Sequence, residues 1–168
     1  YYNHPYYVDF VERYGFVKEV DAVEYRIRNL SKNPFPPRLI EIAERIRLRK
    51  GYSIVRFRNR KDLLSRGNEV LDLLEETYTD LYGVVPLNAN QRAYYVKKYF
   101  PVIPPDLVKL VVNKENKIIG VFAAMPNLST ALQKANGRLF PFGLIHLLLA
   151  MRKPKLVDFI LAGVRKEY

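Results

Sequence analysis

The sequence contains no cysteine and no tryptophan, and only two histidines in 168 residues. Without cysteine the chain has no disulfide, no zinc–thiolate site and no cysteine nucleophile. The two histidines, His4 and His146, lie far apart in the sequence, so a metal site lacks ligands. We expect His4 near a helix start and His146, inside an apolar run, as a half-buried structural residue. The start of the chain does not resemble a signal peptide, and together with the missing cysteines this predicts a cytoplasmic protein.

Long hydrophobic runs are also absent. The longest, Leu144 to Met151, is far too short to cross a bilayer, which needs about 20 residues. We therefore expect no membrane partner. At 168 residues and 49% hydrophobic content, the chain is long enough to form one main core.

Acidic residues are scarce relative to basic ones, which gives a net charge of +11. Eight of the cations gather in one short stretch: Arg45, Arg47, Arg49, Lys50, Arg56, Arg58, Arg60 and Lys61. One interpretation is a solvated helix face followed by an edge strand that charge protects from aggregation. The other is a polyanion-binding stripe, with Arg56, Arg58 and Arg60 on one face of a strand. No nucleic-acid-binding motif accompanies the charge, so nucleic acid is not favoured.

Apolar periodicity and turn residues predict the elements of the first third of the chain. A helix is expected over 4–14 and a strand over 20–27. A stiff, proline-rich linker follows over 30–37 and leads into a basic helix that ends at Gly51. A strand near 52–58 is expected next.

The remainder predicts a mixed pattern of helices and strands. A long helix is expected over 63–82, and a second helix with a capping box over 88–99. Two β-rich runs, 107–112 and 118–124, flank a short polar turn typical of a hairpin. After a helical excursion, a strand is predicted over 157–164.

Two further groups have a structural and a functional interpretation. Glu75 and Glu76 are adjacent on a helix and face different ways, so we do not expect an acid–base pair. Tyr94, Tyr95 and Tyr99 share one short helix and could stack on a ligand, but packing with a polar tip at the surface is the commoner use.

The order strand, two helices, hairpin and further strand resembles the first half of the GNAT acyltransferase superfamily. Four stretches look like one largely uncharacterised bacterial branch of it: 113–121 (NKENKIIGV), 125–129 (MPNLS), 137–143 (GRLFPFG) and 161–164 (LAGV). The resemblance covers about residues 52–168. It implies an α/β (α+β) fold with a mixed, mainly antiparallel sheet and helices on both faces.

The N-terminal part resembles the superfamily at another place. Residues 10–16 are similar to a helix end near the C-terminus of a GNAT domain. The chain is thus expected to hold the C-terminal piece of a preceding GNAT-like unit (1–29), a linker with a basic helix (30–51), and the N-terminal part of a GNAT-like domain (52–168). The alternative is one domain built in permuted order.

The resemblance implies an acetyl-CoA-dependent N-acyltransferase that acts on an unknown amine. The pantetheine arm of the cofactor would pair with the backbone of Leu161, Ala162, Gly163 and Val164, and a backbone N–H within 159–164 would stabilise the oxyanion. Gly163 then either allows close approach of the cofactor or marks a strand-end bulge. Segments 82–87 and 140–142 are the candidate acceptor side.

The catalytic residue stays unassigned. Many GNAT enzymes use a tyrosine as proton donor at the position that is Val11 here, and Tyr7 lies one helical turn earlier. The pyrophosphate-binding loop would follow Tyr168, so we expect this fragment alone to be inactive and to bind acetyl-CoA weakly. A non-catalytic scaffold for an anionic partner is the alternative.

The predicted strand 157–164 lacks its expected parallel neighbour, and an open strand edge recruits another strand. We therefore expect this edge to be covered, either by the segment 20–28 or by a second copy of the chain in a homodimer.

Overall fold

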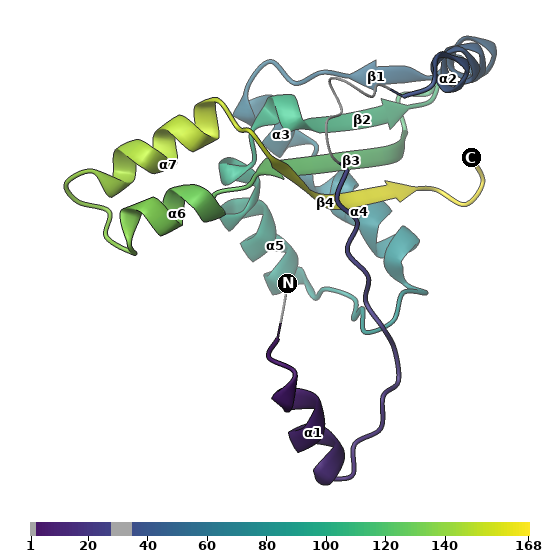
Figure 1. Cartoon of the computed structure of the whole chain (residues 1–168). Coiled ribbons are helices and arrows are strands. Elements are labelled where there is room, and N and C mark those ends of the chain that lie inside the picture. Colours follow the sequence, from purple (N-terminus) through teal and green to yellow (C-terminus); the bar gives the residue numbers. More distant parts are fainter. Residues whose placement is uncertain (1–2, 28–34) are drawn as a thin grey trace. The chain divides into compact units, whose positions relative to one another are not determined.

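The computed structural model describes residues 3–27 and 35–168, except for the side chain of Val102 (Figure 1). The chain divides into two compact units, Tyr1–Ile42 and Ala43–Tyr168. Helix α2 (Pro37–Lys50) runs from the end of the first unit into the second.

The first unit contains helix α1 (Tyr6–Arg13), which ends before Gly15 at a φ of 86°. This helix was expected, although it is shorter than 4–14. The predicted strand over 20–27 is wrong, because these residues adopt no regular structure. The apolar side chains there are exposed, and a strand needs a partner strand for its hydrogen bonds. Arg28 and the linker residues 30–34 lie outside the described residues.

The second unit is built on a four-stranded sheet in the order β1-β2-β3-β4, and every neighbouring pair is antiparallel. The strands are β1 (Ser53–Val55), β2 (Val108–Val112), β3 (Ile118–Pro126) and β4 (Val157–Val164). The α/β class with a mainly antiparallel sheet is therefore confirmed. The hairpin between β2 and β3 turns at Asn113, whose side-chain Oδ1 accepts hydrogen bonds from the backbone N–H groups of Glu115 and Lys117.

Between β1 and β2 the chain forms helices α3 (Arg60–Ser65), α4 (Gly67–Tyr78) and α5 (Ala89–Lys98). Two 3₁₀ turns follow, η1 (Phe100–Val102) and η2 (Pro105–Leu107). The capping box at the start of α5 is confirmed, since Asn88 and Gln91 bond each other's backbone N–H groups.

The single long helix predicted over 63–82 is wrong. The helix breaks at Arg66, which separates α3 from α4, and α4 ends at Tyr78. The buried Gly67 starts α4 at a point where an added Cβ atom would lie 3.3 Å from Val96 and 3.4 Å from Phe100. The close approach of α5 and η1 therefore favours glycine here, and glycine is a poor residue for a helix interior.

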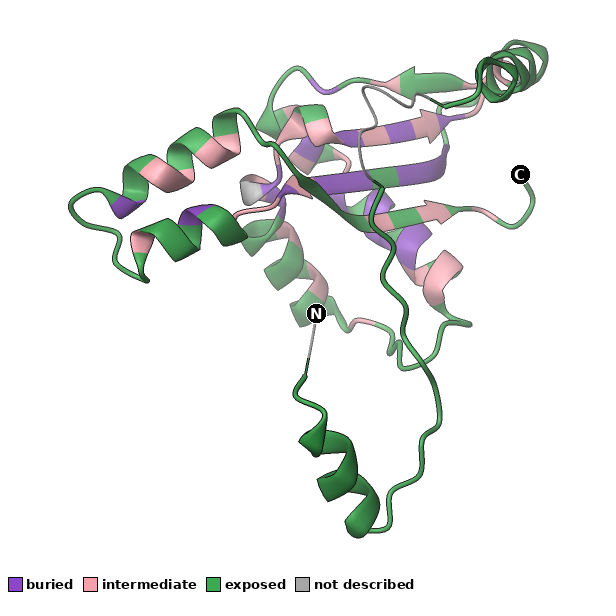
Figure 2. Ribbon diagram, in the orientation of Figure 1, coloured by how far each residue is buried: buried purple, intermediate pink, exposed green. Residues whose placement is uncertain are grey.

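The core lies between one face of the sheet and α4. Leu63, Leu73, Leu110 and Ile118 are almost completely buried. Figure 2 shows the buried residues concentrated on β2, β3 and the adjoining side of α4. The alternation of β3 places Val121 and Ala123 on this face.

The opposite face of the sheet keeps several apolar side chains exposed: Ile54, Phe122, Phe159 and Val164. The rings of Phe122 and Phe159 pack edge to face across β3 and β4, with centroids 4.9 Å apart.

The expected arginine stripe is not formed as predicted. Strand β1 ends at Val55, before all three arginines of the proposed strand face. The backbone N–H of Arg58 bonds the Asp62 carboxylate, and Arg60 begins α3. Arg56, Arg58 and Arg60 therefore share no strand face, because the chain turns into a helix at this point.

A helical hairpin joins β3 to β4. It consists of α6 (Ser129–Ala135) and α7 (Gly143–Arg152), which pack against each other and extend away from the sheet (Figure 1). At its turn, an added Cβ atom on Gly143 would lie 1.9 Å from the carbonyl oxygen of Arg138. Only glycine fits there without moving the backbone.

Candidate functional site

The candidate site is the outer edge of β4, the strand that the sequence analysis selected. Strand β4 pairs with β3 on one side, and among the described residues no strand pairs with its other side. The segment 20–27, which the sequence analysis considered as a cover for this edge, forms no strand in the described structure.

Strand β4 contains a β-bulge at Ile160. On β3, Ala123 and Ala124 are consecutive, but their partners on β4 are Leu161 and Phe159. Ile160 is therefore the extra residue of the bulge. A bulge leaves its extra residue outside the regular ladder and bends the strand locally. The sequence carries no pattern that locates this bulge.

The hydroxyl group of Tyr78 closes one position of the open edge. It accepts a hydrogen bond from the backbone N–H of Ala162 at 3.1 Å and donates one to the carbonyl oxygen of the same residue at 3.0 Å. Both backbone groups of Ala162 therefore point away from β3. The sequence analysis placed Tyr78 only within the helix expected over 63–82 and missed this polar role.

Gly163 has a different role from either one considered in the sequence analysis. An added Cβ atom there would lie 2.7 Å from Oγ1 of Thr77 and 3.2 Å from Cδ2 of Leu73. Gly163 thus faces α4, and its lack of a side chain allows the helix to pack closely on the strand. The bulge is at Ile160 rather than Gly163.

Leu161 and Val164, the first and last residues of the expected cofactor-binding set, differ in burial. The half-buried Leu161 packs against the core, whereas Val164 is 62% exposed on the opposite face. Of the four expected residues, Ala162 alone has both backbone groups shown to point outward.

Ion pairs hold the segment after β4 against the end of α4. Arg165 pairs with Glu76 and also donates from Nε to the carbonyl oxygen of Ile118 at 2.9 Å. Lys166 pairs with Asp80. The hydrogen bond and charge of Lys166 lower the pKa of Asp80, and those of Asp80 raise the pKa of Lys166.

The two adjacent glutamates of α4 serve different partners. Glu75 bonds Nη1 of Arg92 at 2.6 Å, whereas Glu76 pairs with Arg165. Arg92 also pairs with Asp72, so these contacts tie α5 to α4. Glu75 and Glu76 thus form structural ion pairs with two different arginines, on different sides of the helix.

The two segments expected on the acceptor side lie on different elements. Residues 82–87 follow α4 four residues after Tyr78, are mostly exposed, and end at Leu87, which packs on the core. Phe140 and Phe142 lie in the turn of the helical hairpin and are 77% and 68% exposed.

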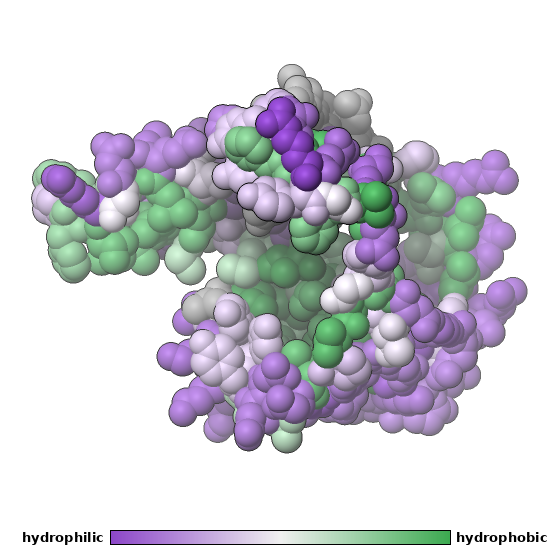
Figure 3. All heavy atoms as spheres, turned by 90° about the horizontal axis from the view of Figure 1, so that it is seen from below, coloured by the Kyte–Doolittle hydropathy of each residue, from purple (hydrophilic) through white to green (hydrophobic). Residues whose placement is uncertain are grey.

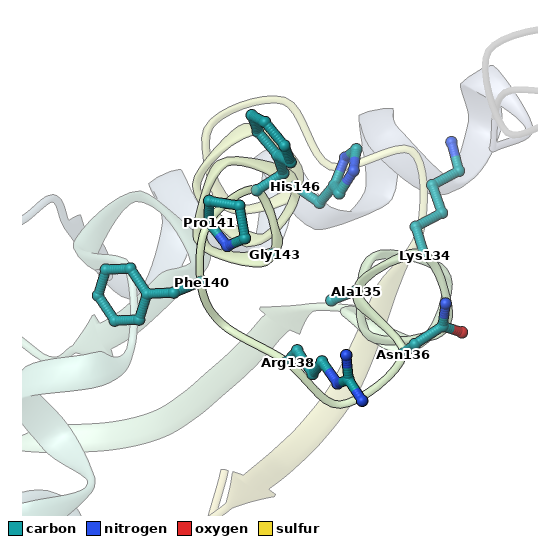
Figure 4. A pocket seen from close by; sticks show the side chains of 9 residues that line it. Lys134, Ala135, Asn136, Arg138, Phe140, Pro141, Gly143 and His146 are labelled. Atoms are coloured by element: carbon teal, nitrogen blue, oxygen red, sulfur yellow. The ribbon is translucent and has the colours of Figure 1, made fainter.

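An open pocket of about 480 Å³ lies within the helical hairpin. Its lining includes Lys134, Arg138, Phe142 and the half-buried His146. In Figure 4 the ring of Phe140 points away from Lys134 and Arg138. The pocket is thus open to solvent and has cations on its border.

The residues considered for proton transfer, Tyr7 and Val11, both lie on α1 and are about half exposed. The three tyrosines of α5 and its end contact one another: Tyr95 and Tyr99 stack with centroids 5.1 Å apart, and Tyr94 meets both edge to face. All three are exposed.

Within residues 3–27 and 35–168, no group of three or more histidine, aspartate or glutamate side chains is placed to hold a metal ion. Over the same ranges, no helix combines the length and apolar character needed to cross a membrane.

No family model matches the chain. It is 23% identical over 166 residues to "Protein YghO" of Escherichia coli (strain K12). The aligned region covers 98% of this chain and 41% of that protein. It is 26% identical over 163 residues to "Bacterial ceramide synthase" of Caulobacter vibrioides (strain NA1000 / CB15N). Here the aligned region covers 94% of this chain and 40% of that protein. The chain thus spans about two-fifths of the length of these relatives, and it is similar to both along almost its whole length.

Proposed function

We propose that this chain forms part of a GNAT-like N-acyltransferase, with an acyl-CoA such as acetyl-CoA as donor and an amine as acceptor. The observation that supports this most is the β-bulge at Ile160 in an edge strand. The element order agrees with the resemblance, because helices α3 to α5 lie between β1 and β2 and a hairpin leads towards β4.

The open edge offers the groups that a thioester donor needs. The amides of the pantetheine arm are extended and can pair with outward backbone groups, as at Ala162. The bulge changes the direction of the backbone groups at Ile160, two residues before Ala162. A backbone N–H directed at the thioester oxygen would stabilise the negative charge that develops there.

The reaction itself needs little from side chains beyond proton transfer. The neutral amine attacks the thioester carbonyl, a C–N bond forms, and the C–S bond breaks to release the thiol of coenzyme A. The proton that the amine loses balances the one that the leaving thiolate gains. We assign neither proton step to a residue.

One relative suggests the class of acceptor. A ceramide is the amide of a fatty acid with a long-chain amino alcohol, so a ceramide synthase forms the same type of bond as the proposed reaction. We therefore propose a lipid amine as acceptor and a long-chain acyl group as an alternative to acetyl.

A second candidate, a non-catalytic scaffold for an anionic partner, is favoured by one observation. Arg45, Arg49 and Lys50 of α2 are exposed, and no ion pair engages them within the described ranges. Strong, salt-dependent nucleic-acid binding without acyl transfer would favour this candidate.

The test of acyl transfer is thiol release from a donor in the presence of an amine. The chain has no cysteine, so a thiol reagent detects only the released product. S-acetyl-pantetheine serves as donor at high concentration, since it carries no nucleotide and needs no pyrophosphate site. Long-chain and short amino alcohols are compared as acceptors, and mass spectrometry identifies the amide.

Two variants make the result specific to β4. Ala162→Pro removes the outward N–H without removing a ladder bond to β3, and we expect it to abolish thiol release. Tyr78→Phe leaves that N–H free and should retain activity. The inactivity expected of the chain with acetyl-CoA does not extend to S-acetyl-pantetheine, which needs no pyrophosphate site. Amine-dependent release that is absent with S-acetyl-pantetheine, or equal in Ala162→Pro, would refute the proposal.

A further inference from the structure

Apart from His146 and Arg152, helix α7 consists of glycine and apolar residues, yet one of its faces is exposed. Leu144, Ile145, Leu148 and Leu149 are 40%, 51%, 56% and 59% exposed. Their spacing places them along one side of the helix, while the half-buried Leu147 lies on another side. A helix that is apolar all round is normally buried, so this face is expected to have a partner.

The turn of the hairpin extends the same apolar surface. Leu139, Phe140 and Phe142 are 50%, 77% and 68% exposed. In Figure 3 the arm formed by α6 and α7, at the left, carries a continuous hydrophobic area bordered by hydrophilic side chains. Large exposed apolar patches rimmed by polar groups mark sites that bind a protein or a membrane.

The charge of the hairpin is entirely positive. No acidic residue occurs between Asn116 and Val157. The segment 127–156, which joins β3 to β4, contains five cations: Lys134, Arg138, Arg152, Lys153 and Lys155. None of these five forms an ion pair within the part of the chain that the structure describes.

We propose that the α6–α7 hairpin docks on the surface of an anionic lipid bilayer. The apolar face of α7 and the aromatic turn would enter the boundary between headgroups and acyl chains, while the cations contact the anionic headgroups. Helix α7 has ten residues and is about 15 Å long, half of the hydrocarbon thickness, so it lies on the bilayer and does not cross it.

This proposal replaces the expectation from sequence that the protein has no membrane partner. That expectation rested on the absence of a spanning segment, which says nothing about a helix lying in the interface. The proposal does not depend on acyl transfer, and lipid binding can be measured whether or not the chain is an enzyme.

Two other partners fit the charge less well. In a symmetric dimer through this face, each copy would present the same five cations to the other, and like charges oppose such a contact. A nucleic acid would engage the cations but would leave the apolar face of α7 in water. An anionic bilayer satisfies both features at once.

The experiment is flotation of the 168-residue chain with vesicles. Vesicles of phosphatidylcholine alone are compared with vesicles that also contain phosphatidylglycerol. We expect the chain to float with the anionic vesicles and to remain largely unbound with the neutral ones, with the binding weakened by added salt. Absence of binding to anionic vesicles would overturn the proposal.

Matched variants locate the contact. Leu148→Ser with Leu149→Ser should reduce binding by about tenfold or more, since both side chains leave the apolar face. The control, Leu39→Ser with Ile40→Ser, changes two neighbouring residues outside the hairpin that are 54% and 55% exposed, and it should bind as the wild type does. All these residues are exposed, so circular dichroism should show unchanged folding.

The charge contribution has its own pair of variants. Arg152→Glu with Lys153→Glu and Lys155→Glu should lower binding by about tenfold or more. Lys97→Glu with Lys98→Glu and Lys114→Glu makes the same change in net charge on exposed sites elsewhere and should have a smaller effect. Equal losses in the two triple variants would mean non-specific attraction and would overturn the assignment to the hairpin.

A fluorescent label reports insertion directly. Phe140→Cys introduces the sole thiol of the chain, and an environment-sensitive dye attached there should shift to the blue with anionic vesicles. The same dye on Val17→Cys, at an exposed position outside the hairpin, should not shift. Light scattering completes the test by measuring the oligomeric state. If the wild-type chain is a dimer and the double variant Leu148→Ser with Leu149→Ser is a monomer, the partner of this face is a second copy, and the proposal is refuted.

Discussion

One hydroxyl group, that of Tyr78, bonds both the N–H and the C=O of Ala162, 84 residues further along the chain. It occupies the position where a neighbouring strand or an extended ligand would pair with β4. The side chain therefore links the end of α4 to the open edge of the sheet and protects one pair of backbone groups from water.

Tyr78→Phe removes this cap. We expect a loss of about 1 kcal/mol in the free energy of unfolding, because two backbone groups exchange a protein partner for water. Amide hydrogen exchange should accelerate at Ala162. Tyr94→Phe is the control, since the Tyr94 side chain is exposed and no hydrogen bond of its hydroxyl is present in the described structure. Unchanged exchange at Ala162 would contradict the role of the hydroxyl.

Gly163→Ala tests the packing of α4 on β4. The new methyl group would lie 2.7 Å from Oγ1 of Thr77, so the helix must shift, and we expect a loss of about 1–3 kcal/mol in stability by urea denaturation. Gly120→Ala on the neighbouring strand is the matched control, because its nearest contact would be an ordinary 3.5 Å. A larger loss in Gly120→Ala than in Gly163→Ala would refute this account.

The Asp80–Lys166 pair predicts a defined pH dependence. The lowered pKa of Asp80 means that its stabilising effect is present above the ordinary value of 3.8 and is lost as the pH falls through the lower folded value. The raised pKa of Lys166 means that its effect is present below 10.5 and is lost as the pH rises through the higher folded value.

Both side chains are mostly exposed, at 69% and 76%, so the effect on stability should be small. NMR titration of the Asp80 carboxyl group provides the measurement. Its midpoint should rise in Lys166→Gln and stay low in Lys166→Arg. A midpoint that is the same in all three proteins would show that the pair does not persist in solution.

The arginines after β1 should behave as solvated surface residues. Arg56→Gln, Arg58→Gln and Arg60→Gln together are expected to change thermal stability by little, since no ion pair engages these side chains within the described ranges. Salt-sensitive nucleic-acid binding that disappears in this triple variant would instead support the scaffold alternative.

Local patterns predicted the elements whose signals are contained in a few neighbouring residues. The strand 157–164 and the capping box at Asn88 are present as expected. The turn at Asn113 likewise follows from polar residues between two β-rich runs.

The features that define the site depend on contacts between distant residues. The helix breaks at Arg66, beside Gly67, which lies against Phe100, and the bulge at Ile160 reflects a register with β3. Residues 20–27 contain β-branched and aromatic residues typical of a strand, but no partner strand pairs with them in the described structure. Neither a register nor a partner is encoded in a short window of sequence.

The central claim is that the outer edge of β4 binds the pantetheine part of an acyl donor, and NMR titration with S-acetyl-pantetheine tests it most directly. At millimolar ligand, we predict the largest amide shift changes at Ile160, Ala162 and Val164, with a further change at the Tyr78 ring as its hydroxyl is displaced. Shift changes that leave β4 unaffected, or no changes at all, would contradict the account.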